Sequence, residues 1–401
     1  MDDVDRDQAL GYLLRFLAIE GTTGHEGAIG EEIAAALREL GIAAEAIRDD
    51  GAHRRIPLPT EAGNLVVSVP GDGGAASRLF VAHRDTVPLC AGARPRLDGD
   101  RVLPAGRTAL GGDDRTGVAC LLTMLATLRR RRLPHGPLTL IFTVREESGL
   151  WGARELDVAM VGTPGLAFNV DGSSPAVLTV GAVGAARWEV EITGRAAHAG
   201  LHPEEGISAP MVAALALAAA QRRGWFGRVH RQPAASGGAA SAGTANVGTL
   251  AGRDGGVVGG ATNVVTDFVR VEGEARSHDE RFVGRIVEAY RRVFTAAAAR
   301  LPNSGGMRAE VAFRSHIAYH PFRFDAESPP VAFARERAAA LGLEPILRVS
   351  DGGLDANWLA RHGIPAVTFG AGQRAIHTLD EHVVLDDYFT ACRLAVALAR
   401  A

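Results

Sequence analysis

The stretch Phe142-Thr-Val-Arg-Glu-Glu-Ser-Gly149 ends a run of β-branched and apolar residues that begins at Pro137. Such a run predicts a strand, and the serine and glycine after the two carboxylates predict a turn. Side chains of consecutive strand residues point to opposite faces, so Glu146 and Glu147 can have two different roles. One carboxylate could bind a metal ion while the other transfers a proton. On this stretch alone, a solvated strand end is the simpler interpretation.

Outward from this strand, strands alternate with helices. The expected strands are 64–70, 78–82 and 165–170, and the expected helices are 4–19, 26–40 and 116–130. This alternation predicts an α/β domain with a mixed or parallel sheet and helices on both faces. In such sheets, ligands bind beyond the carboxyl ends of the strands.

Near Gly181 the pattern changes to that of a half-exposed sheet. A strand, a helix, two strands, a helix and a strand are expected near 186–193, 205–222, 244–250, 264–275, 279–300 and 307–317. This β-α-β-β-α-β order is that of a ferredoxin-like α+β domain. Within it, residues 233–245 are rich in Gly, Ala and Ser and predict a flexible loop.

After residue 321 the α/β pattern returns, with helices expected at 329–341 and 355–362 and strands at 345–349 and 365–369. We therefore expect a discontinuous α/β domain made of residues 1–182 and 319–401. A smaller domain, residues 183–318, would be inserted into it.

Composition and charge argue against several classes of function. The net charge is −3, which provides no electrostatic basis for binding nucleic acid or a membrane surface. The first residues are acidic, unlike a signal peptide, and no run of about 18 apolar residues occurs, so we expect a cytoplasmic protein. All 43 residues counted as lysine or arginine are arginine, which excludes Schiff-base and phosphate-loop lysines. The three distant cysteines are interpreted as buried thiols.

Five acidic or histidine positions lie at the ends of predicted strands or in the loops between elements. They are His83, Asp113 (or Asp114), Glu147 (or Glu146), Asp171 and His377. Alone, each has an ordinary explanation, since a single histidine is usually structural and an Asp-Gly pair is a turn signal. Together, two imidazoles and three carboxylates suit zinc, manganese or cobalt better than calcium or magnesium. They exceed the needs of one tetrahedral ion and fit a two-metal site with a bridging carboxylate.

The order of the motifs resembles that of the co-catalytic zinc exopeptidases over nearly the whole chain. The motifs are His83-Arg-Asp-Thr, Gly111-Gly-Asp-Asp-Arg-Thr-Gly117, Thr143-Val-Arg-Glu-Glu-Ser-Gly149, Asn169-Val-Asp171 and the late His377. That superfamily includes peptidase T, carboxypeptidase G, aminoacylase and succinyl-diaminopimelate desuccinylase. Ser350-Asp-Gly-Gly-Leu-Asp-Ala-Asn357 and the Gly-His-Glu-Gly at 24–27 are most similar to the peptidase T-like branch.

The resemblance implies a phosphorylase/hydrolase-like zinc exopeptidase domain that binds two divalent metal ions, zinc or else manganese or cobalt. His83 and Asp171 would bind one ion, and Glu147 and His377 the other. Asp113 would bridge the two ions, and the peptide bond that follows it would be cis.

The resemblance also implies roles for five further residues. Glu146 would be the general base, and Asp85 would hold the ring of His83. The discontinuous domain, residues 1–182 and 319–401, would be the catalytic domain, and the inserted residues 183–318 would be a lid or dimerisation domain. In this inserted domain, His198 matches a histidine that approaches the metal site of the partner subunit in dimeric relatives. Asn263 and Arg276 match substrate-binding positions.

Two arginines depart from the family pattern. Arg84 occupies a position that usually carries a smaller residue, and Arg145 directly precedes the two glutamates. Both lie close to the expected ligands in the sequence. Either could therefore change the electric field of the site or the shape of its substrate pocket.

The implied activity is hydrolysis of an amide bond in a small peptide, as in a peptidase T-like tripeptide aminopeptidase acting as a homodimer. An N-acyl- or N-carbamoyl-amino-acid amidohydrolase is the alternative, because these enzymes share the ligands. A non-catalytic metal-binding partner protein is disfavoured by the presence of Glu146. Gly370-Ala-Gly-Gln-Arg-Ala375 weakly imitates a dinucleotide-binding fingerprint, but no helix is predicted after it.

Overall fold

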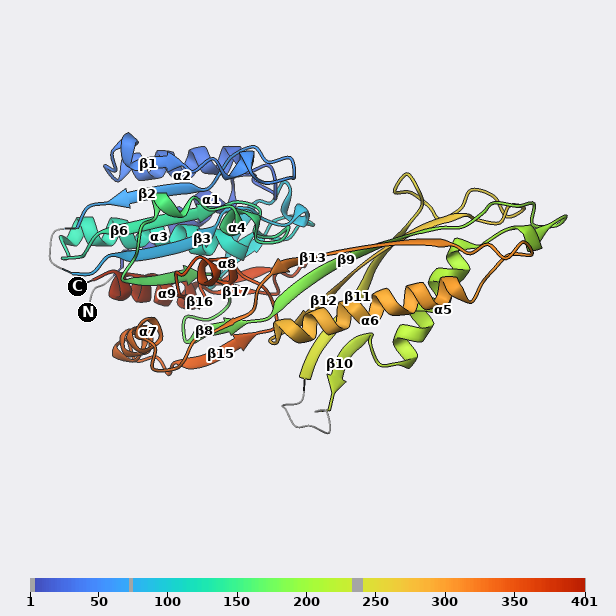
Figure 1. The fold of residues 1–401 in the computed structure, drawn as a ribbon. Helices are drawn as coiled ribbons and strands as arrows, with labels where there is room; N and C mark the ends of the chain where they lie inside the picture. The colour runs from blue at the N-terminus through green and yellow to red at the C-terminus, as the bar shows by residue number, and fades with distance from the viewer. Residues whose placement is uncertain (1–3, 72–74, 233–240, 401) are drawn as a thin grey trace. The chain divides into compact units, whose positions relative to one another are not determined.

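The computed structural model describes residues 4–71, 75–232 and 241–400, which separate into two compact units (Figure 1). Unit 1 consists of two segments, up to Ala182 and from Phe322 onward, and unit 2 is residues 183–321. Unit 1 therefore combines the blue-to-green and red ends of the colour scale in Figure 1, while unit 2 is one continuous segment. The predicted fold class, an α/β domain with an inserted ferredoxin-like α+β domain, is confirmed.

Unit 1 is built on a mixed sheet with the strand order β1-β2-β6-β3-β7-β16-β8-β14, in which β15 also pairs with β8. The strands are β1 (Ile47–Asp49), β2 (Leu65–Val69), β3 (Arg78–His83), β6 (Leu138–Thr143), β7 (Leu166–Val170), β8 (Val177–Ala182), β14 (Phe322–Arg323), β15 (Ile346–Ser350) and β16 (Ala366–Phe369). The four neighbours β6, β3, β7 and β16 are parallel. Their carboxyl ends consequently meet at one edge of the sheet.

Alternating side chains of this sheet pack into two different hydrophobic clusters. In β3, Phe80 and Ala82 join one cluster, and Leu79 and Val81 join the other. The first contains residues of α1 (Arg6–Leu17), α2 (Gly27–Glu39), α3 (Gly112–Arg131), α7 (Pro329–Ala340) and α9 (Leu385–Ala399). The second contains residues of α8 (Ala356–Arg361), which contacts α4 (Trp151–Arg154). Helices thus cover both faces, as two-sided burial of parallel strands requires.

Several short or deeply buried elements were not predicted from the sequence pattern. A small antiparallel sheet contains β17 (Gln373–Arg374), β18 (His382–Val384), β5 (Arg101–Pro104) and β4 (Pro95–Asp98). Strands of two to four residues are too short to carry a periodic signal. Helix α9 is buried along most of its surface, which weakens the amphipathic pattern by which helices are recognised.

Within residues 4–71, 75–232 and 241–400, no helix is both long enough and apolar enough to cross a bilayer.

Unit 2 is an antiparallel sheet covered by two helices. The elements are β9 (Gly184–Thr193), α5 (Ala209–Arg222), β10 (Gly227–Arg231), β11 (Ser241–Ala251), β12 (Phe268–Ser277), α6 (Glu280–Ala299) and β13 (Glu310–Tyr319). The strand order is β10-β11-β12-β9-β13. Without the edge strand β10, this order and the two helices are those of a ferredoxin-like fold.

The prediction of a loop at 233–245 is partly wrong. Residues 241–245 belong to β11 and pair with β10, and residues 243–245 also pair with β12 on the other side. This pairing outweighs their low intrinsic strand preference. Residues 233–240 lie outside the described part of the chain.

The core of unit 2 is organised around Trp188 on β9. Its ring centroid lies 4.6 Å from that of Tyr290 and 5.8 Å from that of Phe313. Gly273 stands opposite Trp188 in the β9–β12 pair. A Cβ atom at Gly273 would lie 2.2 Å from the indole ring and 2.4 Å from the carbonyl oxygen of Asn246. A glycine is required there because the indole occupies the space of a side chain.

Substitution Gly273→Ala is expected to destabilise unit 2 by about 1–3 kcal/mol, since the indole or the strand must move. Gly248→Ala on β11 is the matched control, because among the described residues none, apart from its two chain neighbours, has an atom within 4 Å of the position its Cβ would take. Urea unfolding of the full chain, followed by circular dichroism, measures both. Equal midpoints for the two variants would contradict this account of the core.

Candidate metal centre

The parallel strands bring the predicted ligands to one edge of the sheet of unit 1. Strand β3 ends at His83, and β6 is followed by Glu146 and Glu147. Strand β7 is followed directly by Asp171, whose N–H donates to the carbonyl of Phe369 at the end of β16. The chain after β16 leads to His377.

Asp113 lies between the two histidines. Its Oδ1 is 3.1 Å from His83 Nε2, and its Oδ2 is 3.2 Å from His377 Nε2. The same nitrogen of His377 is 2.9 Å from Glu147 Oε1. Four of the five predicted ligands are therefore in direct contact with one another.

The fifth predicted ligand, Asp171, joins this set through the Asp113 loop. Donor atoms of Asp113, Asp114 and Asp171 all lie within 4.8 Å of one another, as do those of His83, Asp113 and Glu147. Asp113 is thus shared by two groups that could each hold an ion, which is the arrangement that a bridging carboxylate requires.

The alternative ligand Asp114 faces a different environment. The Asp113–Asp114 peptide bond is cis, as the resemblance implied. Asp114 Oδ1 accepts hydrogen bonds from the N–H of Gly117 (3.0 Å) and from Gln373 Nε2 (2.8 Å). Among the described residues its Oδ2 has no hydrogen-bond partner, although it is buried. Asp113, not Asp114, contacts both histidines.

The fully buried Asp85 links the end of β3 to the turn after β6. Its two carboxylate oxygens accept the N–H groups of Glu146 (3.0 Å) and Glu147 (3.2 Å). His83 Nδ1 is 3.1 Å from the backbone oxygen of Asp85 and 3.5 Å from its Oδ1. Asp85 thus contacts the ring of His83, most closely through its backbone oxygen, and its carboxylate holds the backbone of both glutamates.

The electrostatics of the cluster favour a cation. Burial, together with repulsion from neighbouring carboxylates, raises the pKa of Asp171 to about 7. Burial raises the pKa of Glu147 to about 7 against the opposing bond from His377, and it raises the pKa of Glu146 well above its usual value. Hydrogen bonds to Asp113 and Glu147 raise the pKa of His377 to about 10. A divalent ion would neutralise this excess of buried negative charge, and the oxygen and imidazole donors suit zinc, manganese or cobalt.

Two buried carboxylates near the cluster were missed in the sequence analysis. Glu26 Oε1 accepts the N–H groups of Arg145 (3.1 Å) and Gly24 (2.7 Å), so it holds the residue before the two glutamates. Asp355 accepts a hydrogen bond from Thr143 Oγ1, and burial raises its pKa to about 6. Both residues stand inside peptidase T-like motifs, so motif membership was the only available signal.

A third buried carboxylate, Glu381, was also missed. It accepts backbone N–H groups of the loop that carries Asp113. It follows His377 by four residues, which was the only signal for it in the sequence.

The two arginines that depart from the family pattern are directed toward neighbouring loops. The buried Arg84 donates from Nη2 to the carbonyl of Gly63 (2.7 Å). Burial lowers the pKa of Arg84, and the negative charge of Glu26 is the largest effect that raises this pKa again. Arg145 has a left-handed backbone (φ 51°) and donates to Thr60 Oγ1 (2.6 Å), to the carbonyl of Pro59 and to Ser148 Oγ. Both guanidinium groups therefore organise the loops around the cluster.

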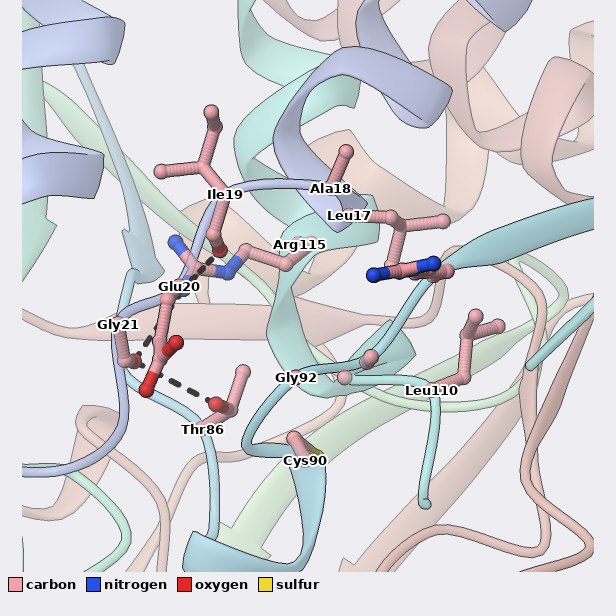
Figure 2. A pocket seen from close by; sticks show the side chains of 13 residues that line it. Leu17, Ala18, Ile19, Glu20, Gly21, Thr86, Cys90, Gly92, Leu110 and Arg115 are labelled. Carbon is pink, nitrogen blue, oxygen red and sulfur yellow. Dashed lines mark hydrogen bonds between the residues drawn. The ribbon is translucent and has the colours of Figure 1, made fainter. Parts of the chain in front are cut away.

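A cavity of about 190 Å³ in unit 1 is lined by residues of the segments 17–21, 86–94 and 110–115 (Figure 2). Figure 2 shows Arg115 donating to the carbonyls of Ile19 and Gly21, and Thr86 Oγ1 donating to Gly21. Burial lowers the pKa of Arg115 to about 10. Thr86, which lines the cavity, directly follows Asp85 in the sequence.

Unit 2 brings together two of its three predicted site residues. The carbonyl of Asn263 accepts the N–H of Ala199, next to His198. The ring Nδ1 of His198 accepts the N–H groups of Gly200 and Leu201 (both 3.1 Å), which leaves Nε2 as the protonated nitrogen. Arg276 lies near the C-terminal end of β12, away from Asn263, which precedes the strand. Arg276 makes a bidentate contact with Glu274 (2.8 and 3.1 Å).

Comparisons with known proteins agree with this geometry. The model of Peptidase family M20/M25/M40 matches residues 79–401. This chain belongs to that family. YqjE of Bacillus subtilis (strain 168) is 31% identical over 396 residues, which is 98% of this chain and 98% of YqjE.

Two solved structures resemble the whole chain. A tripeptidase from Staphylococcus aureus is 28% identical, has a TM-score of 0.85 and aligns over 99% of this chain and 98% of its own. The aminopeptidase PepT from Bacillus cereus is also 28% identical, with a TM-score of 0.81 and the same coverage. The resemblance to the metal-dependent exopeptidases is confirmed, and with it the prediction of a hydrolytic enzyme.

The dinucleotide-binding alternative is not supported for this M20 member. Residues Gln373–Arg374 form β17, and the following residues form a turn through His377 in which Thr378 Oγ1 donates to the carbonyl of Ala375. A phosphate-binding fingerprint requires the first turn of a helix at this position.

Metal binding is expected to release protons, because the metal must displace the proton that His377 carries below about pH 10. Affinity for zinc should therefore rise with pH between 6.5 and 8.5, by about tenfold per pH unit for each proton displaced. Isothermal titration in buffers of different ionisation enthalpy counts the protons.

His377→Asn should bind zinc more weakly and release fewer protons than the wild type. The matched control is His382→Asn, a nearby histidine on β18 that contacts the carbonyl of Asp380. A pH-independent affinity for the wild type would exclude His377 from the ligand set.

Proposed function

We propose that this chain is a two-metal aminopeptidase that removes the N-terminal residue of tripeptides. The observation that carries the proposal is the position of Asp113 between His83 and His377, with two glutamates at the adjacent strand end. Membership of the M20 family and the likeness to a tripeptidase and to PepT at 28% identity support the choice of substrate.

The proposed metal ligands divide into two sets that share Asp113. His83 and Asp171 would hold one ion, and Glu147 and His377 the other. The contact of each Asp113 oxygen with a different histidine supports this division. When bound, such a pair of ions lowers the pKa of a coordinated water toward about 7 and polarises the substrate carbonyl.

Glu146 would act as the general base. Burial and the neighbouring Glu147 raise its pKa well above the usual value, which makes its carboxylate a stronger proton acceptor than an exposed glutamate. It would take the proton of the attacking water and give it to the leaving nitrogen. The two hydrogen bonds from the Glu146 and Glu147 N–H groups to Asp85 would keep both carboxylates oriented.

Three residues of unit 2 would act on the substrate. The protonated Nε2 of His198 would donate a hydrogen bond to the oxyanion, in the manner of other preorganised donors. Asn263, next to His198, would bind the substrate. Arg276 would bind the substrate carboxylate by bidentate contact, in exchange for Glu274.

The length of β12 supports a homodimer in which two copies build each site. Phe268 and Arg276 are eight residues apart on this strand, which spans about 27 Å at ~3.4 Å per residue, and Asn263 lies beyond Phe268. A tripeptide is only about 10 Å long. His198 and Asn263 from one copy and Arg276 from another could contact the same tripeptide, but one copy could not supply all three.

The purified protein with added zinc, manganese or cobalt is expected to hydrolyse tripeptides faster than dipeptides, N-acyl-amino acids and N-carbamoyl-amino acids. Glu146→Gln should lower kcat by roughly 10²–10⁴ because the base is removed. Chromatography of the products and elemental analysis of the bound metal measure activity and occupancy together.

The outcome separates the members of the family. A wild-type protein that binds two ions and prefers N-acyl or N-carbamoyl substrates would be an amidohydrolase. Retention of near-full activity in Glu146→Gln with unchanged metal content would overturn the base assignment. Binding of metal without hydrolysis of any substrate in the panel would favour a non-catalytic partner protein.

Mixing Glu146→Ala and His198→Ala variants is expected to restore activity that each variant lacks alone. If His198 serves the site of the partner, each mixed dimer has one intact site, so random reassociation should restore about one quarter of wild-type activity. Activity is measured after mild dissociation and reassociation, with sedimentation to establish the oligomeric state.

The complementation result has a clear alternative. Activity that stays absent after verified exchange of subunits would show that His198 acts within its own chain. A strict monomer that loses activity on His198→Ala would lead to the same conclusion.

A further inference from the structure

Glu381 joins the two parts of the chain that form the candidate metal centre. Its side chain is only 1% exposed, and its Oε2 accepts the N–H groups of Leu110 and Gly111, both at 2.9 Å. Its Oε1 accepts the N–H of Asp113 at 3.1 Å. One carboxylate from the C-terminal segment thus holds three backbone donors of the loop that carries the shared ligand.

These donors lie at the entry to α3. Leu110 and Gly111 directly precede the helix, and Asp113 is its second residue, so their N–H groups have no partner within the helix. Gly111 has a left-handed backbone (φ 79°), and no capping side chain is provided at this position. A carboxylate at a helix start also interacts favourably with the helix dipole. Glu381 therefore replaces the local cap with one from a distant segment.

The same segment carries His377. Between the two residues the chain forms a closed turn, in which Thr378 Oγ1 donates to the carbonyl of Ala375 (2.7 Å) and Glu381 N–H donates to the carbonyl of Thr378 (3.2 Å). The residue after His382 packs on the Asp113 loop, because a Cβ at Gly112 would lie 3.0 Å from Val383 Cγ2. The backbone turn connects His377 to Glu381, and the carboxylate of Glu381 in turn binds the N–H of Asp113.

We propose that Glu381 is a positioning residue that sets the distance between Asp113 and His377, and that the affinity for metal depends on it. The inference rests on the proposed two-metal function. The carboxylate is required because both oxygens accept N–H groups. A glutamine would turn its own NH2 group toward at least one of these donors.

A residue that only stabilises the fold and one that positions ligands make different predictions. Loss of a purely stabilising contact would lower the melting temperature of the metal-free protein and leave the affinity for metal unchanged. Loss of a contact that orients a ligand weakens metal binding, by ~10–100-fold for residues that support metal ligands in other proteins. Affinity and metal-free stability must therefore be measured separately.

The test compares Glu381→Gln with Asp49→Asn. Asp49 is a matched control because its two oxygens also accept backbone N–H groups from two segments, at Gly51 (2.7 Å) and Gly63 (2.8 Å), and it contacts none of the proposed ligands. Zinc affinity is measured by competition with a chromophoric chelator, and the melting temperature of the metal-free full chain by circular dichroism.

Glu381→Gln is expected to weaken zinc binding by about 10–100-fold, whereas Asp49→Asn should stay within about twofold of the wild type. Zinc affinity of Glu381→Gln within twofold of the wild type would overturn the inference, whatever its melting temperature. A wild-type protein that binds none of zinc, manganese and cobalt would instead reject the proposed function, so the two failures are distinguishable.

If Glu381→Gln does not fold, Gly112→Ala provides a smaller perturbation at the same place. Its new Cβ would lie 3.3 Å from Glu381 Oε1 and 3.0 Å from Val383 Cγ2, so the carboxylate must shift by a few tenths of an ångström. A measurable loss of zinc affinity supports the positioning role, and an affinity equal to that of the wild type overturns it.

Discussion

The contact of one carboxylate with two histidines is the interaction on which the rest of unit 1 depends. Asp113 contacts His83 with one carboxylate oxygen and His377 with the other. Its side chain must therefore keep a fixed position relative to both histidines. Buried groups outside the ligand set achieve this. Asp85 holds the two glutamates, and Glu381 holds the Asp113 loop through backbone N–H groups. Backbone donors suit this purpose because they cannot change rotamer.

Burial gives the centre its electrostatic character. Burial, and after it the repulsion from neighbouring carboxylates, raises the pKa of Glu147 and Asp171 to about 7, and a cation would relieve both effects. Behind the ligands, the guanidinium groups of Arg84 and Arg115 are buried as well, and burial lowers their pKa. Their positive charge offsets Glu26 and Asp85, which leaves the excess negative charge on the ligand side. An arginine suits this place because it stays charged when buried.

Unit 2 poses a different constraint, which is the length of a strand. His198 and Asn263 are neighbours through backbone pairing, whereas Arg276 lies toward the other end of β12. A rigid sheet cannot fold back to bring these ends together, since its core around Trp188 is closely packed. A shared site from two copies is the simplest way in which such a unit can contribute all three residues to one small substrate.

The sequence by itself determined the strand–helix alternation and the inserted ferredoxin-like unit, because these depend on local periodicity. It also proposed the five ligands, through motifs whose order resembles that of a known family. Only the tertiary structure decided that Asp113 rather than Asp114 contacts both histidines, that Arg84 and Arg145 point into neighbouring loops, and that β10 extends the second sheet. It also revealed Glu26, Asp355 and Glu381. These features depend on contacts between segments that lie far apart in the chain, which loop geometry and burial determine and which leave no periodic signal in the sequence.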